Sequence, residues 1–167
     1  DRKLRGVILS EEYKFWKFIS GKKFLNEGLI EFDNRLLTNF YLNKGYYDAK
    51  VNSSFAKLIE DNEFELIYNI NSGPKFLFGD LKLKLPIDYD PKSFLKLEKL
   101  LSKLKNKPYS INSIDKILEE IEILSLDEQY ESVNVQVIEN IDNNILNLTF
   151  DILETDKFFV QRINIFG

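Results

Sequence analysis

Two stretches of the chain alternate apolar and polar residues with the two-residue period of a β-strand buried on one face. Both contain four apolar residues at every second position: Phe64, Leu66, Tyr68 and Ile70 in the first, and Leu146, Leu148, Phe150 and Ile152 in the second. Each follows another apolar run across a short polar turn. Each therefore predicts the second strand of an antiparallel hairpin.

The two stretches are related by a shift of about 82 residues, and the same shift aligns more of the chain. Lys75-Phe76-Leu77-Phe78 recurs as Lys157-Phe158-Phe159-Val160, and Val51 aligns with Val133. The chain is therefore predicted to hold two copies of one module. We place the first copy at residues 1–73, the second at 74–155, and the first strand of a third at 156–167.

The second copy shows the complete order of elements. A strand over 75–85 precedes a helix that Asp90 caps and Pro91 begins. Its predicted buried stripe is Phe94, Leu97, Leu100, Leu101 and Leu104. Ser110 or Asn112 caps a second helix. Strands over 132–138 and 145–153 follow, joined by a turn at 140–144, and we expect Asn147, Thr149 and Asp151 to face water.

The first copy contains the same elements except the opening strand, which we expect upstream of Asp1. Its helices are predicted at 1–9 and 26–43, with Gly45 just beyond the second. Its hairpin is predicted at 48–59 and 63–70, with a turn at Asp61-Asn62. Each module is thus α+β in the order β-α-α-β-β, with two helices packed on a three-stranded mixed sheet. Trp16, in an aromatic connection, is either a partner anchor or a core residue, and the small core favours the latter.

Composition excludes several classes of function. The chain has no Cys and no His, so it lacks the usual zinc ligands, thiol nucleophiles and the acid-base residue that titrates near neutral pH. Its net charge of −4 is spread evenly, without the basic patch of a nucleic-acid-binding protein. The turn at 140–144 lacks the glycine and glutamate of a calcium loop. We expect no enzymatic activity, no cofactor, no metal and no nucleic-acid partner.

The candidate binding feature is the edge of the sheet, where unpaired backbone groups can accept another strand. The resemblance described below implies that the first strand of each hairpin is this edge. In the first module it comprises Lys50, Val51, Asn52, Ser53, Ser54 and Phe55, and in the second Ser132, Val133, Asn134, Val135, Gln136 and Val137. The alternative, that a neighbouring module shields one edge, is equally compatible with the sequence.

Three segments resemble the POTRA repeats of BamA-type outer-membrane protein assembly factors. Leu42-Asn43-Lys44-Gly45-Tyr46-Tyr47 is similar to the family's helix end, and Ile70 to Gly79 is similar to its passage between repeats. Phe159 to Gly167 is similar to the opening strand of the next repeat. The second module departs from the pattern, with Asp127-Glu128-Gln129-Tyr130 at its helix end. The resemblance suggests repeats three and four, followed by the first strand of repeat five.

The resemblance implies binding and relay modules in the periplasm, as the soluble part of an outer-membrane protein. The implied partners are unfolded outer-membrane proteins, accessory lipoproteins of the assembly machine, and a C-terminal membrane barrel of the same polypeptide. Capture of client or partner strands at a sheet edge is the mechanism that we expect. The alternative is a structural or substrate-docking spacer in a related two-partner secretion or translocation-and-assembly transporter.

Overall fold

The computed structural model describes residues 2–8, 27–60, 63–128, 130 and 133–154. The chain divides into two compact units. Unit 1 comprises Asp1–Phe76 with Pro108–Ile111, and unit 2 comprises Leu77–Lys107 with Asn112–Gly167. The module boundaries at 73 and 74 remain predictions. The turn at Asp61-Asn62, the aromatic connection around Trp16 and the segment 156–167 lie outside the described residues.

Unit 2 contains a mixed three-stranded sheet in the order β3-β5-β4. Strand β3 (Leu77–Lys84) runs parallel to the central strand β5 (Ile145–Glu154), and β4 (Val133–Asp142) runs antiparallel to it. The predicted mixed sheet and antiparallel hairpin are confirmed. Because β5 lies between the other two, its alternate residues Leu146, Leu148, Phe150 and Ile152 are almost completely buried.

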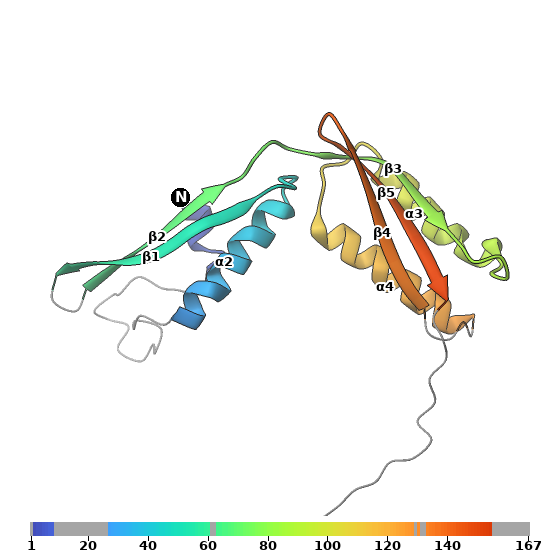
Figure 1. Ribbon diagram of the computed structural model, residues 1–167, viewed down its shortest axis with the longest axis horizontal. Coiled ribbons are helices and arrows are strands. Elements are labelled where there is room, and N and C mark those ends of the chain that lie inside the picture. Colours follow the sequence, from blue (N-terminus) through green and yellow to red (C-terminus); the bar gives the residue numbers. More distant parts are fainter. Residues whose placement is uncertain (1, 9–26, 61–62, 129, 131–132, 155–167) are drawn as a thin grey trace, which may run out of the picture. The chain divides into compact units, whose positions relative to one another are not determined.

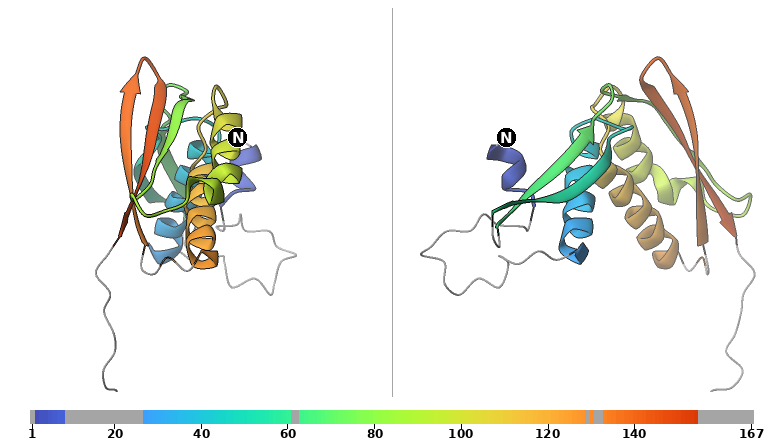
Figure 2. Two further views of the ribbon diagram at one scale, coloured as in Figure 1. Left: turned by 90° about the vertical axis from the view of Figure 1, so that its right-hand side faces the viewer. Right: turned by 60° about the vertical axis from the view of Figure 1, so that its left-hand side comes forward.

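The two helices of unit 2 cover one face of this sheet (Figure 2). A 3-10 turn, η2 (Pro91–Phe94), leads into α3 (Leu95–Leu104), and α4 (Ile111–Asp127) follows. As predicted, Asp90 is the N-cap, its side chain accepting a hydrogen bond from the Lys92 amide at 3.0 Å. Phe94, Leu97 and Leu101 are buried on the helix side of the core, whereas Leu100, predicted to be buried, is exposed.

The β4–β5 hairpin extends further than the alternation of apolar residues predicted. Asp142 pairs with Ile145, so only Asn143 and Asn144 form the turn. Both have positive φ, 45° and 64°, as a type I′ turn requires. Asparagine tolerates this left-handed conformation better than most residues, which explains why two adjacent asparagines stand here.

Unit 1 contains α1 (Arg2–Arg5), α2 (Glu27–Leu42) and the hairpin of β1 (Lys50–Glu60) and β2 (Glu63–Asn71) (Figure 1). Among its described residues the sheet has two strands, paired antiparallel. Helix α2 packs on β1. Its fully buried Asp33 accepts a hydrogen bond from the Tyr68 hydroxyl of β2 at 3.0 Å, so the carboxylate does not lie unsatisfied in the core.

Helix α2 ends at Leu42, shortly before Gly45, as predicted. Gly45 has a φ of 97°, and the Tyr46 amide donates back to the Tyr41 carbonyl at 3.1 Å. This six-residue span is the Schellman arrangement, in which the left-handed residue is usually glycine. Tyr130 makes the same backbone bond to Ser125 at 2.8 Å, at the end of α4. The two helix ends therefore share one capping bond despite their different sequences.

The segment Pro108–Ile111 belongs to unit 1 through specific contacts. Phe76 donates from its amide to the Gly45 carbonyl at 2.7 Å and accepts from the Tyr109 amide at 3.0 Å. The Tyr109 and Tyr47 rings pack nearly perpendicular to each other at a centroid distance of 5.1 Å. Ser110 stands at the predicted capping position before α4, and its hydroxyl donates to Asn43 Oδ1 at 2.7 Å.

Candidate strand-binding edges

Strand β4 forms one edge of the unit 2 sheet. Within the described part of the chain its neighbour is β5 alone. The register runs without interruption from Val133, opposite Glu154, to Asp142, opposite Ile145. Of the residues predicted to bind a partner, Val133, Asn134, Val135, Gln136 and Val137 lie in this strand, whereas Ser132 is outside the described residues. The sequence therefore placed five of these residues on a regular edge.

The two faces of β4 differ in chemistry. Val133, Val135 and Val137 share the helix-covered face with the buried core of β5, because Val135 lies opposite Ile152 and Val137 opposite Phe150. These valines are only half-buried. Asn134 and Gln136 are exposed on the other face. On β4, three half-buried valines thus form an apolar row on one face. Asn134 and Gln136 form an uncharged polar row on the other face.

The hairpin turn also fixes the direction of the β4 backbone groups. The pair that flanks a two-residue turn is hydrogen-bonded, and hydrogen-bonded and non-hydrogen-bonded pairs then alternate. Asp142, and by alternation Asn134 and Gln136, direct their amides toward β5. The amides of Val133, Val135 and Val137 therefore point to the outer edge. The Leu77 amide of β3 donates to the Asn144 carbonyl at 3.0 Å, on the side of β5 that faces away from β4. The direction of this bond agrees with the alternation.

The corresponding edge in unit 1, strand β1, is less regular. Lys50, Val51, Asn52, Ser53, Ser54 and Phe55 all lie in β1, but Val51 pairs with Ile70 and Ser53 with Asn69. Asn52 is consequently the extra residue of a β-bulge, and a second register shift follows between Leu58 and Glu60. A strand over 48–59 was predicted from the sequence, but this bulge was not. A bulge increases twist and leaves one residue unpaired, so β1 is a poorer template for an added strand than β4.

The opposite edge of the unit 2 sheet is partly occupied. The Phe78 amide donates to the Lys107 carbonyl at 2.9 Å, and the Phe78 carbonyl accepts from the Asn106 amide at 2.8 Å. Asn106 has a φ of 63°, which brings this connection alongside the strand. The outward backbone groups at the start of β3 are thus already satisfied. Beyond this point Leu81 and Leu83 border a shallow groove of about 410 Å³, whose other wall includes Leu101 and Lys105.

Asn147 of β5 hydrogen-bonds to both β3 and β4, and Gly79 leaves room for its side chain. The pairing of β3 with β5 shifts between Phe78 and Leu81, and the Asn147 side chain fills this irregularity. Asn147 Oδ1 accepts from the Asp80 amide at 2.8 Å, and its Nδ2 donates to the Asn140 carbonyl at 3.3 Å. Gly79 provides the space, because a Cβ there would lie 2.6 Å from Ile145 Cγ2. A glycine inside a strand pattern was the available sequence signal for this bulge, although it did not identify Asn147.

Two ion pairs join β3 to its neighbours. Lys84 Nζ lies 2.6 Å from Asp151 Oδ2, and Asp151, predicted to face water, is only 6% exposed. Lys84 covers it from the adjacent strand. Lys105 Nζ lies 2.5 Å from Asp80 Oδ1, with both side chains largely exposed. The hydrogen bond from Lys105 and its positive charge hold the pKa of Asp80 below its usual value of 3.8.

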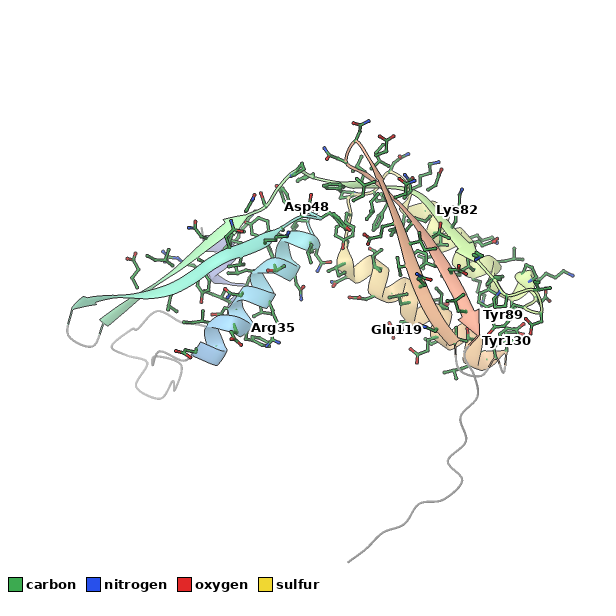
Figure 3. All side chains as sticks on the ribbon, viewed as in Figure 1. Arg35, Asp48, Lys82, Tyr89, Glu119 and Tyr130 are labelled. Atoms are coloured by element: carbon green, nitrogen blue, oxygen red, sulfur yellow. The ribbon has the colours of Figure 1, made fainter. Side chains whose placement is uncertain are left out.

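An aromatic cluster closes the end of unit 2 where β4 begins. The Tyr89 and Tyr130 rings (Figure 3) stack at a centroid distance of 3.6 Å. The Phe94 ring lies beside them, with its centroid 6.2 Å from that of Tyr89 and 6.5 Å from that of Tyr130. The Tyr130 hydroxyl also accepts a hydrogen bond from the Asp90 amide at 3.0 Å. Tyr130 therefore fixes the chain just before the candidate edge strand to the loop that follows β3.

The described residues contain no group of three His, Cys, Asp or Glu side chains that could hold a metal ion. Among the same residues, every helix is too short or too polar to cross a lipid bilayer. The candidate site is the backbone edge of β4, since an exposed strand edge can pair with another strand through backbone hydrogen bonds.

The chain is similar to known assembly factors along its whole length. Residues 1–73 match the POTRA family, described as a surface antigen variable number repeat. The outer membrane protein assembly factor BamA of Neisseria meningitidis is 26% identical over 170 residues, covering 100% of this chain and 21% of the relative. BamA of Neorickettsia risticii is 25% identical over 171 residues, covering 100% and 22%. The chain thus spans about a fifth of the length of these relatives.

Two solved structures share the fold. The crystal structure of Haemophilus influenzae BamA POTRA3-5 superposes with a TM-score of 0.69 at 19% identity, covering 93% of this chain and 61% of that one. BamA from Haemophilus ducreyi lacking POTRA domains 1-3 gives a TM-score of 0.63 at 13% identity, covering 83% and 25%. The predicted α+β class and the repeat architecture agree with both.

Proposed function

We propose that this chain, a POTRA region of the BamA type whose residues 1–73 belong to the POTRA family, serves outer-membrane protein assembly. It acts as a set of binding and relay modules in the periplasm, attached to a membrane barrel of the same polypeptide. Its partners are unfolded outer-membrane proteins and accessory lipoproteins. The two modules correspond to repeats three and four of such a protein.

The observation that carries the proposal is the uninterrupted outer edge of β4. An extended client segment is held there by β-augmentation, in which backbone hydrogen bonds give affinity without requiring a particular sequence. From Val133 to Ile138 the strand carries no charge and no proline. Charged residues and proline are common devices that prevent pairing at an edge, so this part of β4 lacks two of the usual protections against an added strand.

Binding at this edge is weak, which suits a relay. Each new backbone hydrogen bond contributes about 0.5 to 1.5 kcal/mol net, whereas ordering each client residue costs about 1 to 2 kcal/mol. Side-chain contacts must therefore offset the difference. A client held by so small a net free energy of binding dissociates readily and can pass to the next binding site. Lys50 to Phe55 in β1 provide a second edge, weakened by the bulge at Asn52.

The direct test is an NMR titration of the full chain with extended peptides taken from outer-membrane barrel strands. We expect shifts concentrated at Val133 to Val137, with smaller shifts in β1. Shifts confined to the helices, or none at millimolar peptide, would reject edge capture.

The matched variants are Val135→Pro and Val135→Ala. Both remove the half-buried side chain, but only proline also removes the amide that points to the outer edge. Val135→Pro should weaken peptide binding well beyond Val135→Ala while β4 remains paired with β5. Gln136→Pro is the contrasting change, because it removes an amide directed toward β5 and should destabilise the hairpin itself.

A further inference from the structure

We infer that the helix layer of unit 2, meaning the outward faces of α3 and α4, docks a second copy of this chain, with α3 of each copy lying on α4 of the other. This inference is independent of strand capture at β4. Three observations carry it: the two helices have opposite charge, they lie side by side in antiparallel directions, and they expose apolar side chains beside the charges.

Charge of opposite sign is concentrated on the two helices. Residues 91–107, which include α3, contain six lysines and one glutamate. Residues 111–128, which include α4, contain six acidic residues and one lysine. Charges that nearly balance over the whole chain are therefore separated on this surface.

On α3 the charges form a row that faces away from the sheet. The helix buries Leu97 and Leu101. Lys96, Lys99 and Lys103 lie on its exposed side. Their spacing of three and four residues places these lysines on one face of the helix, and we call them the basic row.

On α4 a matching row carries the opposite charge. The helix buries Ile117 and Ile121. Asp115, Glu119 and Glu122 lie on its exposed side, at a spacing of four and three residues. We call these three residues the acidic row.

Neither row has a partner among the residues that the structure describes. No hydrogen bond or ion pair there involves the side chain of any residue of the two rows. Lys84 and Lys105, which are also largely exposed, do pair with Asp151 and Asp80. The two rows differ from these lysines because their charges are available to another molecule.

The two helices are antiparallel neighbours. Residues 105–110 join the end of α3 to the start of α4. At the opposite end Tyr130, which follows α4, stacks on Tyr89 and accepts a hydrogen bond from Asp90, which precedes η2 and α3. Both helices cover the same face of the sheet (Figure 2). The basic row and the acidic row therefore lie next to each other on one surface.

A surface with a basic half beside an acidic half is complementary to a copy of itself. A twofold axis between two copies, parallel to the helices, places each α3 on the α4 of the other copy in an antiparallel pair. The spacings then agree, because the basic row read backwards and the acidic row read forwards both have intervals of four and three residues. This register pairs Lys103 with Asp115, Lys99 with Glu119, and Lys96 with Glu122.

Exposed apolar side chains on the same layer add to the contact. Leu95 on α3 is 50% exposed, and Ile123 and Leu126 on α4 are 45% and 67% exposed. The register set by the charged rows also brings Leu95 opposite Ile123. Removal of these side chains from water favours association, whereas the charges fix its orientation.

The size of the layer limits the strength of the dimer. At 1.5 Å per residue, the 10 residues of α3 and the 17 of α4 span about 15 and 25 Å. Two helices, each about 10 Å across, therefore present roughly 300 to 500 Å², less than the about 800 Å² per partner of a stable interface. We expect a weak dimer that depends on charge and is weakened by salt.

The test is sedimentation velocity of the full chain at low salt, with charge-reversed variants. One variant carries Lys96→Glu, Lys99→Glu and Lys103→Glu, and the other Asp115→Lys, Glu119→Lys and Glu122→Lys. Each variant alone should associate at least about tenfold more weakly than the unchanged chain, because like charges then face each other. An equimolar mixture of the two should associate again, since each row of one variant is complementary to the facing row of the other.

A matched control separates the rows from net charge. Lys50→Glu, Lys75→Glu and Lys82→Glu together change the net charge as much as reversal of the basic row does, and all three lysines are exposed outside the helix layer. This control should associate like the unchanged chain. Association of the mixed variants also shows that both are folded, because the rows exist only on formed helices.

A chain that stays monomeric at about 1 mM and low salt overturns the inference. It is overturned in the same way if the monomer binds phosphatidylglycerol vesicles through the basic row, since that row would then be a lipid-binding surface. Association that both charge-reversed variants retain, with NMR shifts at β4 and not on the helices, also overturns it. So does failure of the mixed variants to associate.

Discussion

The Asn147 side chain fills the space that a Cβ on Gly79 would need. Such a Cβ would lie 2.9 Å from Asn147 Cγ and would overlap Asn147 Oδ1. Gly79 does not have a positive φ, so this glycine is required by packing and not by backbone conformation. The same asparagine links β3 to β4. The space left by Gly79 on β3 is therefore filled by the asparagine that also hydrogen-bonds to the candidate edge strand.

Gly79→Ala should destabilise unit 2 by about 1 to 3 kcal/mol, the usual cost of overpacking a filled site. The measurement is the free energy of unfolding in urea, followed through the amides of unit 2. Gly6→Ala is the control, because a Cβ at Gly6 would meet only the Lys3 carbonyl at 3.5 Å. A Gly79→Ala change as mild as Gly6→Ala would contradict the packing argument.

A double-mutant cycle isolates the contact between these residues. Asn147→Ala removes the group with which the new methyl overlaps, although it also removes the acceptor of the Asp80 amide. The double variant should therefore be more stable than the sum of the two single changes predicts, by about 0.5 to 3 kcal/mol. Strict additivity of the two changes would show that the cost of Gly79→Ala arises elsewhere.

Lys84→Met should destabilise unit 2 by about 1 to 3 kcal/mol, since it leaves the nearly buried Asp151 carboxylate without its ion-pair partner. Lys82→Met is the matched control on the same face of β3, because Lys82 is also exposed but lies opposite Thr149, whereas Lys84 lies opposite Asp151. Thermal or urea unfolding at neutral pH would compare the two variants. Equal stabilities would mean that Asp151 does not depend on Lys84.

Lys105→Gln should raise the pKa of Asp80 toward 3.8, since Lys105 provides the hydrogen bond and the charge that lower it. A carboxylate with a lower pKa in the folded state contributes stability above pH 3.8. That contribution is lost as the pH falls through the folded value. Carboxyl NMR titration measures the pKa, and added salt should reduce the difference between the two proteins because the pair is exposed. An unchanged Asp80 pKa in the variant would contradict this assignment.

Tyr130→Phe should cost about 0.5 to 1.5 kcal/mol, because it removes the acceptor of the Asp90 amide but retains the ring stacked on Tyr89. Tyr130→Ala should cost about 2 to 4 kcal/mol, since the stacking and the packing are both lost. Amide exchange near Asp90 would show the local effect. A phenylalanine variant as unstable as the alanine variant would assign the main contribution to the hydroxyl instead of the ring.

The alternating strands were predictable because side-chain polarity repeats with the geometry of the sheet. Leu146 to Ile152 on β5 were therefore located from the sequence. The edge position of Val133 to Val137 does not follow from this alternation and was expected only from the family resemblance. Asp151 was misjudged because its polarity gave no sign of Lys84, which approaches from a strand more than sixty residues earlier. The bulge at Asn52 was missed because it exists only in the pairing of β1 with β2.

The same limit applies to the direction of the backbone amides. The exposed side chain of Asn134 does not indicate that the amide of this residue points to the outer edge. The hairpin register instead directs the Asn134 amide toward β5 and the Val135 amide outward. Side-chain exposure follows from the order of residues along a strand, whereas the direction of an amide depends on the turn that closes the hairpin.

The hydrogen bonds of Asn106 and Lys107 to Phe78 make the unit 2 sheet asymmetric, with a closed start on one side and a continuous edge on the other. A sheet that can be extended on both sides can serve as a link in an indefinite stack, as in a cross-β fibril. A sheet with one continuous edge can pair edge to edge with a single further copy of itself, because the pairing uses that edge on both copies. Pairing of unit 2 with itself through β4 would therefore stop at two copies and would not build a stack.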